Sequence, residues 1–260
     1  MRKYNFLLLV LMAGVLAACA GSGKGGVSAS GLTSENWKNQ ASLVRGGRLY
    51  DKWYAVAERP TPTTPHPAYP VTAKYAKKAK SNWRCKECHG WDYMGKEGAY
   101  SSGKHYTGIK GIRSMSGADT SAVLAILKNN THSLAGKMSD QDFQDLAIFV
   151  SQGQVDMDGY IDRSTGKVIG GDVGKGEAFF HAACANCHGR EGRSMKGMPA
   201  LGKISNGNPW ETLHKILNGQ PDEGMPSMRA LGREIPSMRA MNFQAPTDIL
   251  AFIQTLPQEK

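Results

Sequence analysis

The sequence predicts an all-α protein made of two tandem helical domains. A Cys-x-x-Cys-His motif at residues 85–89 recurs ninety-nine positions later, at residues 184–188, which indicates an internal repeat. Apolar residues recur at helical spacing around both copies, and no segment shows the sustained alternation of a β-strand. A chain of 260 residues is long enough for two domains of ordinary size.

The helices of the first repeat are expected on both sides of its motif. One helix is expected over residues 42–57 and another over residues 120–127. A third begins after Ser139, which forms a capping pattern with Asp142. Its apolar positions are Phe143, Leu146, Ala147 and Val150. A Pro-rich insertion precedes Cys85, and the sequence leaves open whether it is a strap across the domain, a lid or a docking surface. Its prolines are Pro60, Pro62, Pro65, Pro67 and Pro70.

The second repeat has the same order of elements, with less sequence before its motif. A helix containing residues 174–180 leads directly into Cys184. A helix over residues 210–217 comes next, and a last helix follows Pro246. The apolar positions of this last helix are Ile249, Leu250, Phe252, Ile253 and Leu256. Each repeat therefore has the order helix, motif, helix, Met-bearing loop, helix.

The N-terminus predicts a bacterial lipoprotein signal. Arg2 and Lys3 precede an apolar run over residues 6–16, and the Leu-Ala-Ala-Cys string ending at Cys19 resembles a lipobox. This resemblance implies cleavage before Cys19 and a lipid anchor on its sulfur, at the periplasmic side of a bacterial membrane. Ala20 at the next position favours the outer membrane, by analogy with enteric bacteria. An ordinary secretory peptide with a chance cysteine is the alternative. The apolar run is short for a bilayer of ~30 Å, which disfavours a retained transmembrane anchor.

These features divide the chain into five parts. A signal peptide covers residues 1–18, and a Gly- and Ser-rich flexible tether covers residues 19–36. The first domain, with its Pro-rich insertion, covers residues 37–155. A linker over residues 156–172 then joins it to the second domain, residues 173–260.

The repeated motif is the attachment sequence of c-type haem. Two thiols three positions apart can form thioethers to one porphyrin, and the following histidine then ligates the iron. A zinc site would need four ligands for each motif, and a disulfide or a redox dithiol does not account for the histidine. The sequence therefore predicts two haem c groups. The predicted attachment residues are Cys85, Cys88, Cys184 and Cys187, and the predicted iron ligands are His89 and His188.

The order of elements around each motif resembles the small all-helical cytochrome c domain. The resemblance covers residues from about 43–152 and 173–256, and it is closer in the second repeat, where Cys-His-Gly-x-x-Gly ends at Gly192. It implies a methionine as the sixth iron ligand. In the first repeat this is Met138, just before the last helix, with His132 as the main rival and His105 as a weaker one.

For the second haem the resemblance favours Met225, which precedes a proline after an Asn-Gly-x-Pro turn. The remaining candidates are Met228, Met238 and Met241. The resemblance also implies that the carbonyl of Pro199 accepts a hydrogen bond from the His188 ring. No proline follows His89 at a similar distance, so the first haem needs another carbonyl, near Gly108 or Ile109. His181 and His214 are interpreted as structural residues.

The chain is basic. Its formal charge falls from +10 to +8 on removal of residues 1–18, which carry two positive charges and no negative one. An exported lipoprotein does not meet nucleic acid, so the charge indicates redox partners with an acidic docking surface. The densest basic run leads into the first motif and contains Lys74, Lys77, Lys78, Lys80, Arg84 and Lys86.

The resemblance implies electron transfer between periplasmic or membrane redox partners, without a catalytic residue. Histidine and methionine on each iron would leave no position for a substrate. The alternatives are a haem enzyme of the thiosulfate dehydrogenase type and a cytochrome subunit of a larger oxidoreductase. The catalytic haem of the thiosulfate dehydrogenase family typically has a cysteine ligand, and all five cysteines here already have another role.

Overall fold

The structure is a computed structural model that describes residues 34–234 and 244–260. It is all-α, as predicted, and within these residues the only β pairing consists of two isolated bridges. The predicted signal peptide, Cys19, Met238 and Met241 lie outside the described residues. Residues 34–36, predicted as the end of the tether, belong to the first helix. No described helix is both long and apolar enough to cross a membrane.

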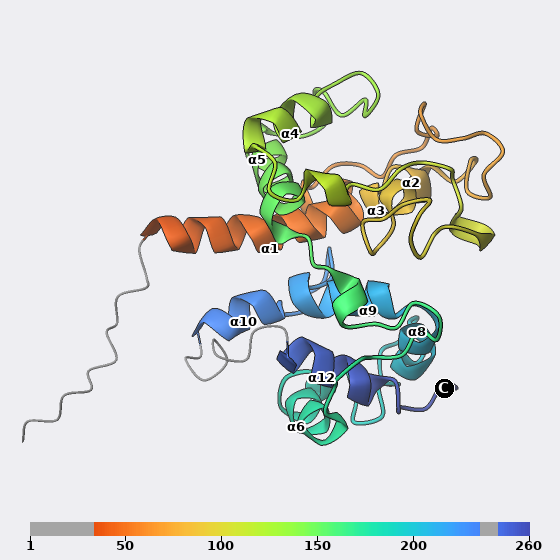
Figure 1. The fold of residues 1–260 in the computed structure, drawn as a ribbon, viewed down its shortest axis with the longest axis vertical. Coiled ribbons are helices and arrows are strands. Elements are labelled where there is room, and N and C mark those ends of the chain that lie inside the picture. Colours follow the sequence, from red (N-terminus) through yellow and green to blue (C-terminus); the bar gives the residue numbers. More distant parts are fainter. Residues whose placement is uncertain (1–33, 235–243) are drawn as a thin grey trace, which may run out of the picture.

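The helices form two groups, stacked one above the other in Figure 1. The N-terminal half, residues 34–155, contains α1 (Ser34–Val56), α2 (Ala79–Asn82), α3 (Cys85–His89), α4 (Thr120–Leu127), α5 (Asp140–Ile148) and the π-helical turn η3 (Phe149–Gly153). The C-terminal half, residues 173–260, contains α6 (Val173–Ala183), α7 (Ala185–His188), α8 (Leu201–Gly207), α9 (Pro209–Asn218), α10 (Met228–Glu234) and α12 (Gln244–Ile253). Short 3₁₀ turns are η1 (Gly103–His105), η2 (Arg113–Met115) and η4 (Met157–Gly159).

The predicted helices of the first half are present. The helix expected over residues 120–127 is α4, and Asp119 caps its N-terminus by accepting hydrogen bonds from two backbone amides. Ser139 and Asp142 form the predicted capping box at the start of α5. The first helix begins earlier than expected, at Ser34, and ends one residue earlier, at Val56.

In the N-terminal half α1 packs against α5 and η3 at a glycine. A Cβ atom at Gly46 would collide with the carbonyl oxygen of Asp145 and with Cβ of Phe149, so only glycine permits this close approach. Arg45 beside it pairs with Asp142 and, at 2.8 Å, with Asp145. The α1 and α5 backbones are therefore held together by close packing and by ion pairs.

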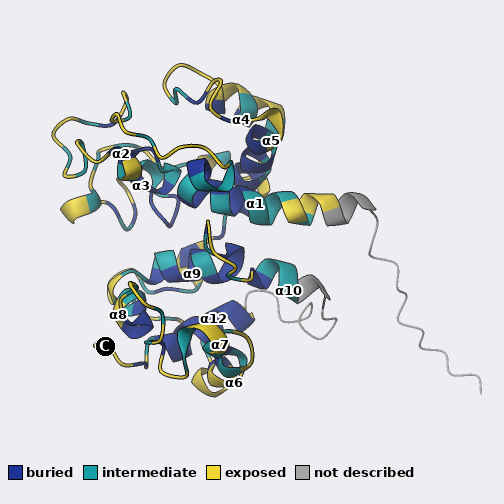
Figure 2. Ribbon diagram, turned by 180° about the vertical axis from the view of Figure 1, so that it is seen from behind, coloured by how far each residue is buried: buried dark blue, intermediate teal, exposed yellow. Residues whose placement is uncertain are grey.

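The C-terminal half repeats this crossing with α6 and α12. A Cβ atom at Gly176 would collide with the carbonyl oxygen of Asp248 and would lie 3.0 Å from Cβ of Phe252. The last nine residues of α12 are all buried, which makes α12 the centre of this half (Figure 2). The two halves thus share one packing arrangement between their first and last helices.

Helix α9 joins the halves by packing on α1. Asp51 of α1 is fully buried and forms ion pairs with Arg84 and, at 3.0 Å, with Lys215 of α9. Burial opposes the ionisation of Asp51, but the positive charges of Lys215 and Arg84 outweigh it and hold the pKa of this carboxyl below its usual range. This ion-pair network connects the first helix, the residue before Cys85 and the second half.

His214 of α9 is also buried at this boundary, as its structural interpretation requires. Its Nε2 lies 2.9 Å from the carbonyl oxygen of Gly47, and its Nδ1 lies 3.0 Å from the Tyr93 hydroxyl. An imidazole with N–H on Nε2 donates to Gly47 and accepts from Tyr93, so the ring satisfies both partners when neutral. Burial lowers the pKa of His214 to about 4, which keeps it neutral near pH 7.

Candidate functional site

The two Cys-x-x-Cys-His motifs have the same local backbone. Residues 85–89 form the short helix α3, and α7 contains residues 185–188, with Cys184 at its N-cap. Each motif is followed by a glycine in the left-handed region, Gly90 (φ 79°) or Gly189 (φ 75°). The chain then turns back in both cases. The amide of Gly95 donates to the carbonyl of His89 at 2.9 Å, and the amide of Ser194 donates to that of His188 at 3.0 Å. Because glycine adopts a positive φ without strain, this turn explains the glycine after each motif.

None of the four motif cysteines forms a disulfide. Burial raises the pKa of Cys85 and of Cys88 to about 12, and that of Cys184 to about 11. A redox dithiol reacts through its thiolate, which burial disfavours at Cys85, Cys88 and Cys184. Formation of thioethers to haem, the predicted use of these residues, removes the ionisable group altogether.

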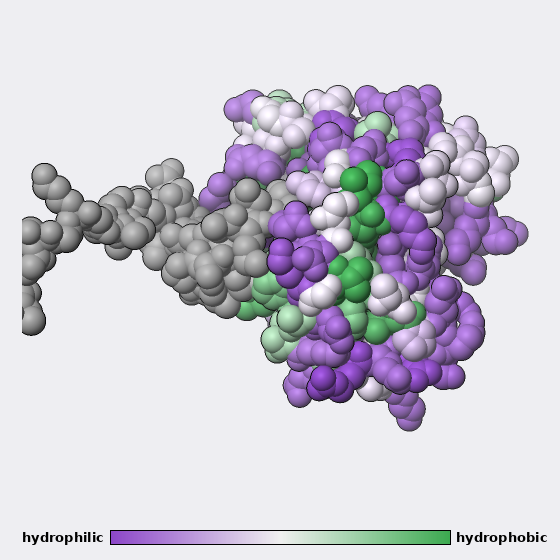
Figure 3. Space-filling view, turned by 60° about the horizontal axis from the view of Figure 1, so that its bottom comes forward, coloured by the Kyte–Doolittle hydropathy of each residue, from purple (hydrophilic) through white to green (hydrophobic). Residues whose placement is uncertain are grey.

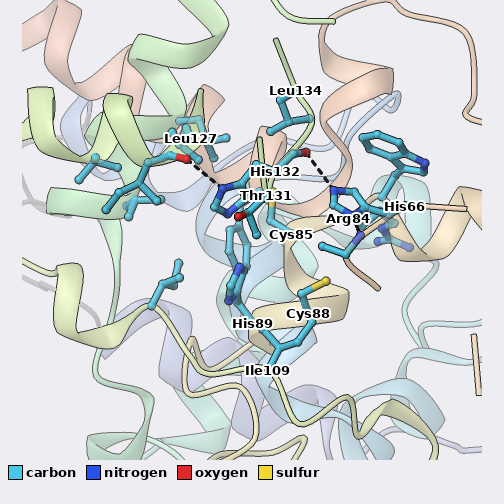
Figure 4. A pocket seen from close by; sticks show the side chains of 18 of the residues that line it. His66, Arg84, Cys85, Cys88, His89, Ile109, Leu127, Thr131, His132 and Leu134 are labelled. Carbon is cyan, nitrogen blue, oxygen red and sulfur yellow. Dashed lines mark hydrogen bonds between the residues drawn. The ribbon is translucent and has the colours of Figure 1, made fainter. Parts of the chain in front are cut away.

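An apolar cavity lies beside the first motif. Cys85, Cys88 and His89 of α3 form one wall of the cavity (Figure 4). Much of the remaining wall is aliphatic, from Ile109, Ile112, Val123, Ile126, Leu127, Leu134, Leu146 and Val150. An apolar cavity that also exposes two thiols and an imidazole suits a large, flat, apolar cofactor.

The His89 ring is held by the backbone. Its Nδ1 lies 2.8 Å from the carbonyl oxygen of Lys110, one residue beyond the predicted region of Gly108 and Ile109. Since a carbonyl only accepts, Nδ1 carries the proton and Nε2 keeps its lone pair for a metal. Burial lowers the pKa of His89 to about 4, so the ring is neutral near pH 7, as a metal ligand must be.

His132 lines the same cavity. Its ring centroid lies 6.4 Å from that of His89, and Figure 4 shows the two rings close together in the cavity. Nδ1 of His132 lies 2.9 Å from the carbonyl oxygen of Ile126, so this ring too has its lone pair on Nε2. Burial also lowers the pKa of His132.

The two other predicted ligands of the first haem are placed elsewhere. Met138 is buried in the hydrophobic core and is not one of the residues that line the cavity. His105 stacks on Tyr100, and its Nδ1 lies 2.8 Å from a carboxylate oxygen of Glu87. Of the three candidates weighed in the sequence, the cavity therefore contains His132 alone.

The Pro-rich insertion reaches this cavity through His66, which the sequence did not single out. Nε2 of His66 lies 2.9 Å from the carbonyl oxygen of His132, and its ring packs edge-on against Trp83 at 4.3 Å. Nε1 of Trp83 donates to the carbonyl of Thr64 at 2.8 Å, and this bond fixes the insertion against Trp83. Of the three alternatives, these contacts favour a strap across the domain. No motif in the sequence marks His66.

The histidine of the second motif has no hydrogen bond that holds its ring within the described residues. Nδ1 of His188 is buried without a hydrogen-bond partner in the described part of the chain. The predicted bond to Pro199 is therefore absent, and Pro199 itself is exposed just before α8. Met225 is half-buried, with its carbonyl 3.0 Å from Nη2 of Arg48. Met228 is buried in the core at the start of α10.

The basic run before the first motif is divided between two environments. Arg84 pairs with Asp51, and buried Lys86 pairs with Glu87 at 2.8 Å. The other four members, Lys74, Lys77, Lys78 and Lys80, are exposed. On the face in Figure 3 the surface is mainly hydrophilic, with one narrow apolar band.

A family model matches the C-terminal part of the chain. Residues 173–257 match the family model of Cytochrome c, which supports a c-type cytochrome and covalently bound haem. No match to the chain is found among curated proteins. The residues at both motifs fit this cofactor. The first offers an apolar cavity with two thiols and a neutral imidazole, and the second has the same turn around its two thiols and histidine.

Proposed function

We propose that the chain is a lipid-anchored dihaem c-type cytochrome that carries electrons between redox proteins on the periplasmic side of a bacterial membrane. Its cytochrome c domain supports haem-based electron transfer in general. The observation that carries the dihaem proposal is the geometric repeat of the motif, because both copies have the same short helix, the same left-handed glycine and the same backbone turn.

When bound, haem supplies an iron that changes its valence by one electron. The chain's own residues would hold the haem and shield it from water. Cys85 and Cys88 would hold the first haem, and Cys184 and Cys187 the second, with His89 and His188 as ligands of the two irons. The Lys110 carbonyl keeps the His89 ring in one orientation and one tautomer. The aliphatic walls of the cavity limit the reorganisation of water when charge arrives.

The experiment is to measure haem content and iron accessibility in the full chain, matured in a host that attaches haem. We expect two covalent haems per chain, and one in each of the double variants C85A/C88A and C184A/C187A. We also expect no carbon monoxide uptake by the reduced protein, because both irons are closed by protein ligands. One haem per chain would contradict the dihaem proposal. Ready carbon monoxide binding would favour the enzyme alternative.

The anchor and the partner are separate parts of the proposal. We expect mass spectrometry to find lipid on Cys19 and the Cys19→Ser variant to leave the membrane fraction. For the partner, the exposed Lys74, Lys77, Lys78 and Lys80 offer a positive surface to an acidic protein. Replacing these four by Gln should slow electron exchange with an acidic partner at low salt. An unchanged rate would exclude this surface.

A further inference from the structure

We propose that His132, and not a methionine, is the second axial ligand of the first haem. This inference rests on the proposed function, because it requires haem at the first motif. It assigns two imidazoles to one iron and explains why a loop far from the motif in sequence is held against its cavity.

The separation of the two rings carries the proposal. Metal–nitrogen bonds of about 2 Å place the centroids of two imidazoles on opposite sides of one metal roughly 6 Å apart. The centroids of His89 and His132 are 6.4 Å apart, and their planes are inclined by 36°. Direct packing of two rings also occurs at such distances, but here both Nδ1 atoms donate to backbone carbonyls, which leaves both Nε2 lone pairs without a proton.

His132 is fixed at three points, as a ligand has to be. Its Nδ1 donates to the carbonyl of Ile126, and its amide donates to the side chain of Asn129 at 3.2 Å. Its carbonyl accepts from Nε2 of His66 in the strap. Ring orientation and backbone position are thus set independently. A carbonyl on Nδ1 of a metal-bound histidine is the usual device that fixes its tautomer.

The sulfur alternatives have weaker support. Met138 lies in the core, outside the lining of the cavity. Met115 at the end of η2 does line the cavity and is the stronger sulfur rival on geometry. Within residues 34–234 and 244–260, no ring contact or hydrogen bond positions the Met115 side chain, whereas three contacts position His132. The test therefore includes variants of both methionines.

The test uses the full chain with both haems, after its haem content has been confirmed. In the oxidised protein we expect a magnetic resonance signal of an iron with two imidazoles. The His132→Met variant should lose this signal and gain a methionine-to-iron charge-transfer band. In His132→Ala, one of the two reduced irons should bind carbon monoxide. Met138→Leu and Met115→Leu should keep the wild-type spectra.

Two results would overturn the assignment. One is loss of a methionine band in Met138→Leu or Met115→Leu together with unchanged spectra in both His132 variants. The other is absence of a two-imidazole signal from a wild-type chain that carries two haems. A wild-type chain with fewer than two haems would instead contradict the proposed function, so the two failures are distinguishable.

Discussion

The two halves of the molecule share a scaffold and differ in what surrounds the haem motif. Gly46 against Asp145 and Gly176 against Asp248 make the same helix crossing. In the first half, however, Cys85 follows its glycine by 39 positions, whereas Cys184 follows Gly176 by 8. The additional residues form the strap that holds the His132 loop.

This difference shows which features of a haem site depend on local sequence. The motif helix, the left-handed glycine and the turn back to the histidine carbonyl are encoded within eleven residues and occur in both halves. Among the described residues, a backbone carbonyl holds the ring of the motif histidine in the first half, at His89, but not in the second, at His188. The strap is also found only in the first half. The motif helix and its turn therefore stay the same in both halves, whereas the contacts that hold the histidine ring and the neighbouring loop differ.

The largest effect should come from breaking the ion-pair network between the halves. Asp51→Asn leaves Arg84 and Lys215 without their buried carboxylate, and we expect a loss of roughly 3–5 kcal/mol in the free energy of unfolding. Chemical denaturation measures it. The control is Lys175→Gln, which removes an exposed pair with Asp172 and should change stability by less than about 1 kcal/mol. Equal effects would mean that the network does not join the halves.

The next effect is the pH dependence of stability that arises from His214 at the same boundary. The folded pKa of His214 is about 4, and an unfolded histidine titrates near 6.5. The unfolded chain therefore binds the proton first, so stability should fall by about 3 kcal/mol as the pH drops from 6.5 to 4. The charged or titratable groups around the ring are Tyr50, Asp51, Tyr93, Lys215 and Arg229.

His214→Gln, which does not titrate, should remove this part of the pH dependence and keep the rest. Denaturation of both proteins at pH 7 and at pH 4.5 gives the comparison. If the wild type and His214→Gln lose stability equally over this range, His214 is not the group that couples the boundary to pH.

A smaller effect tests whether the two helix crossings are equivalent. Gly46→Ala and Gly176→Ala each force a methyl group into a backbone carbonyl, and each should lower stability by roughly 1–3 kcal/mol. Gly207→Ala is the control, because nothing lies within 4 Å of its added Cβ. Thermal unfolding with both haems in place measures all three variants. A large effect in only one half would show that the scaffold is not repeated.

The smallest expected effect tests the strap. His66→Ala removes one hydrogen bond to the His132 carbonyl, which should lower stability by about 1 kcal/mol and shift the magnetic resonance signal of the first haem. His66→Gln can still donate and should restore the signal. Val71→Ser, at an exposed position of the same insertion, should leave it unchanged. If the magnetic resonance signal of the first haem is the same in all three variants as in the wild type, His66 does not position the ligand.

The sequence predicted the features that depend on nearby residues. The spacing of Ser139 and Asp142 identifies the start of α5, and the residues of α4 were predicted from their helical spacing. The partner of the His89 ring was expected within two residues of its actual position, at Lys110. The contact between the Pro-rich insertion and the loop of His132 could not be predicted in this way. His66 and His132 are 66 positions apart, and only the folded chain shows that one holds the other.

A potentiometric titration of the fully oxidised dihaem protein tests most directly whether the sixth ligand of the iron differs between the two halves. Methionine ligation raises the potential of a haem above that of a haem with two histidines. We predict two resolved one-electron steps, of which the lower disappears in C85A/C88A and the higher in C184A/C187A. A single step for both haems, or loss of the lower step in C184A/C187A, would contradict the account.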